Sequence, residues 1–265
     1  MRRILIVVAY DGTNYHGWQV QDNGNTIEGE LNRAISTLTG EVIEVIGASR
    51  TDSGVHGLCN RAVFDTASTI PAERFYAAIN SNLPDDIRVI SSKEVHADWH
   101  PRKCKTYKTY EYCIDCGDVA NPLASRYSWH VRGPLNLTNM QESAKFLLGE
   151  HDFTSFCSVN GTALTNVREI FSIDINVNGR GWSTNPDMHI DGGEQIIDDG
   201  KITIRVTGNG FLYNMVRIIA GTLVHAGMGR FQAAEIANIL EALDRTKAGP
   251  TAPPQGLTLV HIKDV

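Results

Sequence analysis

The run Arg50-Thr51-Asp52-Ser53-Gly54-Val55-His56 could carry out chemistry. It places the Asp52 carboxylate between an arginine and a histidine, with a hydroxyl on each side and a glycine that permits a tight turn. A carboxylate held in such a loop is accessible to a ligand that approaches the backbone closely. The alternative is ordinary turn chemistry, because Asx turns of the Thr-Asp-Ser-Gly type are more common than active sites.

Two further segments place polar or charged side chains where burying them would cost free energy. In the run 108–112, strand alternation places Lys108, Tyr110 and Tyr112 on one face, although a tyrosine in a strand is more often part of a core. In the run 208–217, a glycine turn leads into a helix in which Arg217 interrupts apolar residues. Arg217 therefore needs a buried or interfacial partner, unless it reaches solvent along the helix surface. The Gly-x-Gly of this turn lacks the rest of either nucleotide-binding fingerprint.

One stretch of the chain is both basic and aromatic. Its four cations fall within seven positions and alternate with tyrosines: Arg102, Lys103, Lys105 and Lys108. Such a mixture suits phosphates and stacking bases, whereas the alternative is an exposed strand face of solvated lysines. The formal net charge of −6 and the pI of about 5.8 argue against non-specific coating of nucleic acid.

Composition and length limit the other classes. The chain has 265 residues, of which 42% are hydrophobic and 20% charged, as in ordinary globular proteins. No apolar run approaches the roughly 20 residues of a membrane span, so we expect a cytoplasmic protein. Its five cysteines predict reduced thiols. Cys113-x-x-Cys116 lacks a second ligand pair, so no metal is predicted.

Hydrophobic periodicity predicts the elements that position these residues. Strands are expected at 4–10, 42–46, 60–65 and 87–90, with helices starting from an Asn25 cap and from Pro71. This is the β-α-β-β-α-β order of a ferredoxin-like domain.

The second half repeats this logic. The pattern predicts strands at 107–114, 127–131, 167–177, 202–206 and 257–262, and helices from a Thr138–Gln141 capping box, from Phe211 and around Ile236. An acidic, glycine-containing segment at 178–200 is interpreted as a solvated excursion. We therefore predict two α+β domains, 1–100 with the Asp52 loop and 101–265 with the tyrosine strand and the Arg217 helix.

Five ordered motifs together resemble the tRNA pseudouridine synthase A family. They are R-T-D-S-G-V-H, then R-x7-Y-x-Y from Arg102, H-D-F-T-S-F at 151–156, G-N-G-F-L-Y-N-M-V-R at 208–217 and D-R-T-x-A-G-P-T-A-P-P-x-G-L at 244–257. The resemblance spans nearly the whole chain. It implies two ferredoxin-like (RRM-like) halves forming a continuous mixed, mainly antiparallel sheet with helices on one face and a central cleft, the pseudouridine synthase fold.

The resemblance also implies an activity. It indicates a cofactor-free isomerase, acting as a homodimer, that converts uridine to pseudouridine at positions 38, 39 and 40 of tRNA. Asp52 would be the essential carboxylate, Arg217 its partner and Tyr110 the active-site tyrosine. Arg50 would help to extrude the nucleotide, and Thr51, His56 and the basic stretch would bind RNA. Ser49 and the 57–60 continuation depart from the family pattern. This leaves open a synthase acting at another RNA site, or an inactive RNA-binding protein.

Overall fold

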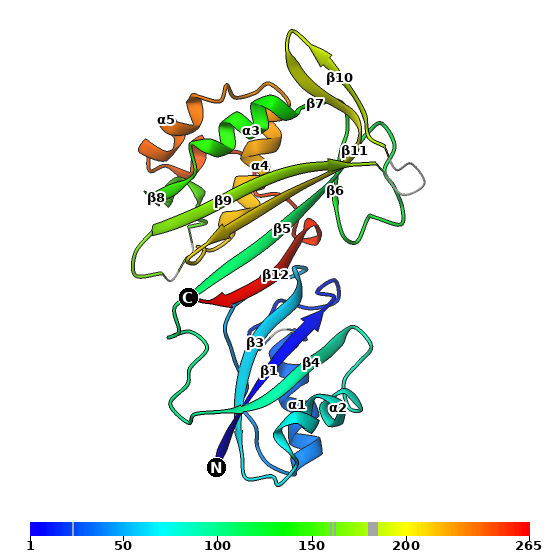
Figure 1. Ribbon diagram of the computed structural model, residues 1–265, viewed down its shortest axis with the longest axis vertical. Coiled ribbons are helices and arrows are strands. Elements are labelled where there is room, and N and C mark those ends of the chain that lie inside the picture. Colours follow the sequence, from blue (N-terminus) through cyan, green and yellow to red (C-terminus); the bar gives the residue numbers. More distant parts are fainter. Residues whose placement is uncertain (23, 160, 162, 180–184) are drawn as a thin grey trace. The chain divides into compact units, whose positions relative to one another are not determined.

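The computed structural model describes residues 1–22, 24–159, 161, 163–179 and 185–265 (Figure 1). The chain forms two compact units, one of Met1–Thr106 with Thr258–Val265 and one of Tyr107–Leu257. The sequence-based division at residue 100 gives the last strand to the second domain. The structure instead returns that strand to unit 1, because it pairs with a strand there.

The sheet of unit 1 is built on three antiparallel strands. β1 (Arg2–Tyr10) lies between β3 (His56–Thr66) and β4 (Ile87–Val95). β12 (Leu257–Asp264) pairs in parallel with β3, with Thr258 opposite His56. The expected strand at 42–46 is reduced to the two-residue β2 (Ile46–Gly47).

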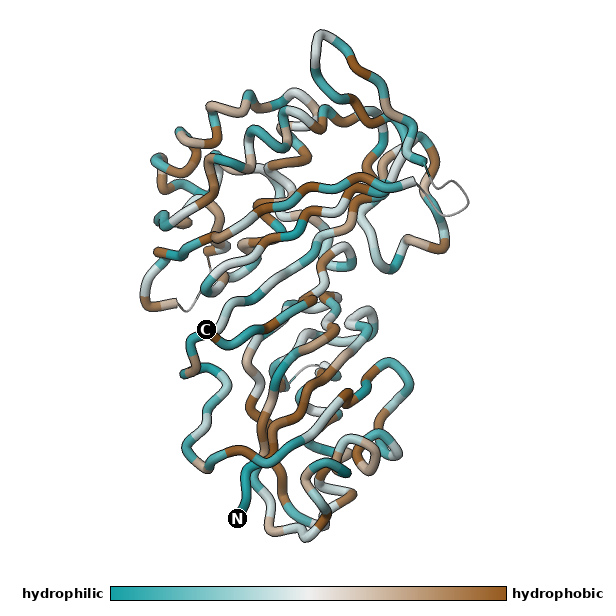
Figure 2. The backbone as a smooth tube through the Cα atoms, in the orientation of Figure 1, coloured by the Kyte–Doolittle hydropathy of each residue, from teal (hydrophilic) through white to brown (hydrophobic). Residues whose placement is uncertain are grey.

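The helices of unit 1 pack against this sheet. α1 (Ile27–Thr39) and α2 (Phe75–Asn80), the latter preceded by the 3₁₀ turn η1 (Ala72–Arg74), enclose a core with Ile4, Ile6 and Val8 of β1. Figure 2 shows the hydrophobic character of β1 along most of its length. Every second residue of β1 therefore faces the helices.

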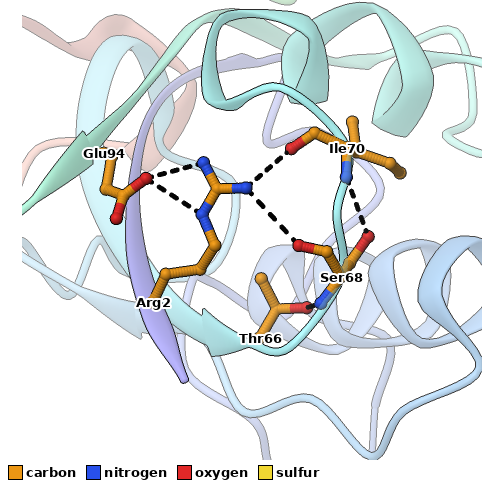
Figure 3. Close-up of polar contacts among 5 residues, drawn as sticks. All are labelled: Arg2, Thr66, Ser68, Ile70 and Glu94. Carbon is orange, nitrogen blue, oxygen red and sulfur yellow. Dashed lines mark hydrogen bonds and ion pairs between the residues drawn. The ribbon is translucent and has the colours of Figure 1, made fainter.

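Arg2, at the start of β1, joins the strands at one end of this sheet (Figure 3). Its guanidinium donates from Nε and Nη2 to Glu94 at 2.9 and 2.6 Å, and from Nη1 to the Ile70 carbonyl at 2.9 Å. One side chain therefore joins the start of β1, the end of β4 and the loop that leads to η1.

Unit 2 contains a run of neighbouring antiparallel strands. Its order is β5 (Thr106–Cys116), β11 (Glu194–Gly208), β9 (Val167–Asn178) and β8 (Gly149–Asp152). Three short strands extend it: β6 (Trp129–Val131) on β5, and β7 (Leu135–Asn136) and β10 (Asp187–Asp191) on β11.

Three helices accompany this sheet: α3 (Leu137–Lys145), α4 (Met215–Gly227) and α5 (Glu235–Glu241). The 3₁₀ turns η2 (Thr154–Phe156), η3 (Arg245–Lys247) and η4 (Pro254–Gly256) lie in the connections. α4 starts four residues later than the position expected at Phe211. Almost all of its residues are buried, and the α+β class is confirmed.

The acidic segment at 178–200 is only partly a solvated excursion. β10 and the start of β11 form an exposed hairpin, but Ile197 is fully buried where β11 pairs with β7. The alternation expected in 167–177 also breaks, because an irregularity in the β9–β11 pairing buries Ile170 and exposes Phe171. Gly181 lies outside the described residues.

Candidate active site

The Asp52 loop of unit 1 is a tight turn with fixed ends. Val55 N–H donates to the Asp52 carbonyl at 3.1 Å, and Gly54 has a φ of +78°, a conformation that favours glycine. The Gly54 N–H and the Ser53 hydroxyl both donate to the Tyr15 carbonyl, at 3.2 and 3.1 Å. The turn therefore holds the half-buried Asp52 in one place.

A second segment, Tyr10–Trp18, supports this loop from unit 1. Trp18 N–H donates to the Thr51 carbonyl at 3.0 Å. Gly17 has a φ of +87°, and a Cβ there would lie 2.6 Å from the Thr51 carbonyl oxygen. A Cβ on Gly12 would lie 2.0 Å from the Val55 carbonyl oxygen. The sequence pattern indicated only a strand end and a turn here. The two glycines between aromatic residues were the signal that another part of the backbone lies close to this segment.

Thr51 and His56 lie beneath the loop, and both are buried. The hydroxyls of Thr51 and Tyr10 are 2.8 Å apart, and the His56 Nδ1 atom accepts from Gly12 N–H at 3.0 Å. The Asp11 carboxylate also lies 3.1 Å from Nδ1. These contacts connect both side chains to the Tyr10–Trp18 segment. The family resemblance assigned both residues to RNA binding.

Arg50 and Arg102 come together in unit 1, and both are exposed. Arg102 donates from Nε to the Gly47 carbonyl at 2.8 Å, which anchors its side chain. Burial of its inner part lowers the pKa of Arg102, and the nearby Arg50 guanidinium lowers it further. Two neighbouring guanidinium groups, one of them anchored, can bind a phosphate.

The rest of the basic stretch is divided. Lys103 and Lys105 are exposed in unit 1, with Lys103 close enough to contribute to a lowered pKa of His100. Lys108 is half-buried in β5 and belongs to unit 2. Only Arg102, Lys103 and Lys105 therefore share a unit with Arg50.

The two tyrosines of β5 have different surroundings. Tyr110 is 8% exposed, and its ring meets Phe211 edge-on with centroids 5.3 Å apart. Tyr112 is fully buried and donates from its hydroxyl to the Pro253 carbonyl at 2.8 Å. Burial raises the pKa of Tyr112, and the nearby Arg217 guanidinium acts in the opposite direction.

Arg217 is fixed within unit 2 by two neighbouring segments. Its Nε donates to the Ala252 carbonyl at 2.7 Å, and its Nη1 donates to the Asn214 Oδ1 atom at 2.7 Å. Ala252 N–H in turn donates to the Arg217 carbonyl at 3.1 Å. The side chain is half-buried and held by defined acceptors, which favours the partnered arginine over the snorkelling alternative.

The chain from residue 244 to 256 forms this seat. Gly249 N–H donates to the Thr222 hydroxyl of α4 at 2.9 Å, and Arg245 donates to the Gly249 carbonyl at 2.9 Å. Asp244 N–H donates to the hydroxyl of the fully buried Ser155, also at 2.9 Å. The motifs at 151–156 and 244–257 therefore act together as a scaffold for Arg217.

Cys113 and Cys116 occupy opposite faces of β5, because residues three apart in a strand point in opposite directions. Burial raises the pKa of the Cys113 thiol, and Cys116 lies 3.2 Å from the Gly133 carbonyl oxygen. Across the described ranges, no three His, Cys, Asp or Glu side chains gather as metal ligands. None of the helices described there is long and apolar enough to cross a membrane.

Comparison with known proteins places this geometry in a family. The sequence profile described as "tRNA pseudouridine synthase" matches residues 6–102 and 143–263. The chain belongs to the tRNA pseudouridine synthase family. It is 45% identical to the tRNA pseudouridine synthase A of Ruminiclostridium cellulolyticum and 44% identical to that of Brevibacillus brevis. It is 43% identical to that of Thermoanaerobacter sp. strain X514, and each match covers 99% of both chains.

Membership of the tRNA pseudouridine synthase family confirms the predicted isomerase class and the pseudouridine synthase fold. Asp52, Arg50, Arg102 and Arg217 fall within the two segments that match the synthase profile. Tyr110 lies between them, in the part covered by the full-length relatives.

Proposed function

We propose that this protein isomerises uridine to pseudouridine at positions 38, 39 and 40 in the anticodon stem-loop of tRNA. The observation that carries the proposal is the Asp52 turn, held from below by the Tyr10–Trp18 segment and flanked by the exposed Arg50–Arg102 pair. This arrangement presents a fixed carboxylate beside two cations suited to the RNA backbone.

The three reacting groups have separate roles in this proposal. Asp52 supplies the ionised carboxylate while the bond from C1′ to N1 breaks and the bond from C1′ to C5 forms. Arg217 favours the ionised state of that carboxylate, as an apposed guanidinium does. Tyr110 stacks on the flipped uracil and assists removal of the C5 proton. Atoms balance without an added reagent, because the base is rejoined to the same sugar and the C5 proton is exchanged for one on N1.

Flipping a base from its stack costs a few kcal/mol, which contacts with the backbone must offset. Arg50 and Arg102 are the leading candidates for those contacts, since they are exposed and near each other. Lys103, Lys105 and Lys108 extend the basic stretch along the chain. For Thr51 and His56 we propose support of the loop, because both are buried.

We further propose that the protein acts as a homodimer in the cytoplasm, without a metal or cofactor. Five free cysteines are consistent with a reducing compartment. A dimer would let one subunit hold the body of a tRNA while the other receives the anticodon arm. An active monomer, measured by sedimentation at assay concentration, would exclude the dimer.

The deciding experiment is position-resolved mapping of pseudouridine on unmodified tRNA incubated with the purified full-length protein. Two transcripts are compared, one with uridines at positions 38–40 and one with cytidines there. We expect pseudouridine in the first transcript only, without added metal. Modification at other positions in both would indicate a different target, and no modification of any RNA would refute the enzyme activity.

Asp52→Asn tests the carboxylate, since asparagine keeps the shape and removes the charge. We expect loss of turnover with tRNA binding nearly unchanged. A variant that retains a tenth of the wild-type rate would refute the assigned role. Arg217→Met should also lower turnover strongly.

Arg50→Ala and Arg102→Ala test the backbone contacts through their salt dependence. Each lost phosphate contact should flatten the slope of log affinity against log salt by roughly 0.7 to 0.9. Arg74→Ala, at the exposed arginine that ends η1 in the same unit, provides the matched control with an unchanged slope. Slopes equal to wild type in both test variants would exclude these arginines from the interface.

A further inference from the structure

Asn214 has a backbone conformation that its position in the chain does not require. It precedes the first residue of α4 with φ +60° and ψ 6°, in the left-handed region that is uncommon for residues other than glycine. At a helix start, an asparagine side chain usually accepts a hydrogen bond from a backbone N–H of the first turn. The Asn214 side chain makes no such bond.

The amide of Asn214 is instead used to connect two other residues. Its Oδ1 atom accepts from Arg217 Nη1 at 2.7 Å, and its Nδ2 atom donates to the Ser158 hydroxyl oxygen at 2.9 Å. Because a guanidinium group only donates, the oxygen of the amide must face Arg217 and the NH₂ group must face Ser158. Ser158 is itself tied to this turn, since its N–H donates to the Tyr213 carbonyl at 3.1 Å.

These contacts fix the orientation of a charged group. Ala252 accepts from Nε, and Asn214 accepts from Nη1, so the plane of the Arg217 guanidinium is held at two different nitrogens. Hydrogen bonds that involve an ionised donor are stronger and more directional than neutral ones. Loss of Asn214 would remove one of these two restraints on the end of the Arg217 side chain.

We propose that Asn214 is a positioning residue for Arg217, with Ser158 holding the amide of Asn214 in the required orientation. This inference rests on the role proposed above for Arg217. The left-handed backbone of Asn214 is then explained, because it directs the side chain away from the helix N–H groups and toward the guanidinium.

The test compares single and double variants of the full-length protein in single-turnover and steady-state assays on tRNA. Asn214→Gly removes the amide and suits the left-handed backbone, so the protein should fold with only a modest fall in its thermal unfolding midpoint. We expect kcat to fall about ten- to a hundredfold, the effect of losing a hydrogen bond to a charged group, and KM to change less than about twofold. Ser158→Ala should lower kcat by a smaller factor in the same way.

Asn209→Gly is the matched control, because its amide oxygen accepts from Glu169 N–H rather than from Arg217. This variant should keep the wild-type kcat. The decisive measurement is a double-mutant cycle: in an Arg217→Met background, Asn214→Gly should have no further effect on the rate.

Two outcomes would overturn the inference. One is a wild-type kcat for Asn214→Gly, and the other is an equal loss of kcat in the presence and absence of Arg217. Failure of the proposed function would be distinguishable, because then the wild-type protein would form no pseudouridine or Arg217→Met would be fully active.

Discussion

Gly221 provides a direct test of how Arg217 is seated. It lies in the middle of α4, and a Cβ there would lie 1.9 Å from the Pro250 carbonyl oxygen. To reach an ordinary contact of 3.4 Å, the two backbones must separate by about 1.5 Å. The obstacle is a backbone carbonyl in a segment bonded to α4 on both sides, so it cannot move alone.

Gly221→Ala should therefore destabilise the protein although alanine is the better helix former. The gain in helix propensity is about 1 kcal/mol, whereas overpacking against a rigid neighbour costs about 1–3 kcal/mol and occasionally more. With the clash at the upper end of that range, the net loss is about 2 kcal/mol. This corresponds to a fall in Tm of roughly 4–8 °C.

The same substitution should reduce activity. A shift of the Pro250 segment moves Ala252, whose carbonyl accepts from Arg217 Nε. Loss of a hydrogen bond to a charged group costs about 1.5–3 kcal/mol, so kcat should fall by about ten- to a hundredfold. Thermal unfolding and pseudouridine formation at saturating tRNA measure the two effects.

Gly227→Ala in the same helix is the matched control. The nearest atoms to its new Cβ would be the Met140 sulfur and Cγ at 2.8 and 2.9 Å, and an unbranched side chain adapts more easily than a backbone carbonyl. We expect its Tm and kcat to stay close to wild type. If Gly221→Ala also leaves both unchanged, the 244–256 segment does not seat Arg217.

Three further predictions follow from single contacts. The bidentate contact with Arg3 lowers the pKa of Asp65 below its ordinary 3.8. The ion pair therefore stabilises the fold at neutral pH, and this stabilisation is lost as the pH falls through the lowered pKa. Asp65→Asn should lower Tm at pH 7 and have little effect on Tm near pH 2. Tyr112→Phe leaves the Pro253 carbonyl without its hydroxyl donor and should cost about 1–3 kcal/mol in urea unfolding, whereas unchanged stability would contradict that bond. Gly17→Ala combines a positive φ with a clash against the loop and should lower both Tm and kcat, and a wild-type rate would show that the Tyr10–Trp18 segment does not position Asp52.

Periodicity predicted most of the elements because burial on one face repeats in the sequence. In β1 every second residue, from Ile4 through Ile6 to Val8, faces one core. In α1 the apolar residues Ile27, Leu31 and Ile35 recur at helical spacing and face the same core. Helix starts were less predictable, because several neighbouring polar residues can act as caps. The cap of α1 is Thr26 rather than Asn25, and that of α3 is Asn136 rather than Thr138, whose hydroxyl accepts from Gln195 N–H instead.

In the candidate site, residues could be predicted from their neighbours in the sequence, whereas contacts with distant backbone groups could not. Arg217 could be singled out because a charged residue among apolar helix neighbours is costly wherever it lies. One of its acceptors could not be identified, since the Ala252 carbonyl is a backbone group 35 residues away and carries no side-chain signal. The support of Asp52 by Tyr15 was hidden for the same reason, because it depends on the backbone carbonyl of Tyr15.

A net charge of −6 is compatible with a polyanionic substrate because the negative charge is concentrated in one region. Residues 185–200, in and around the β10–β11 hairpin, contain neither lysine nor arginine and carry five acids: Asp187, Asp191, Glu194, Asp198 and Asp199. The rest of the chain therefore has a formal charge of only −1. Salt-dependent affinity for RNA counts the phosphates that are neutralised by contact, not the total charge of the protein. The exposed Arg50–Arg102 pair in unit 1 can therefore govern binding in a protein whose overall charge is negative.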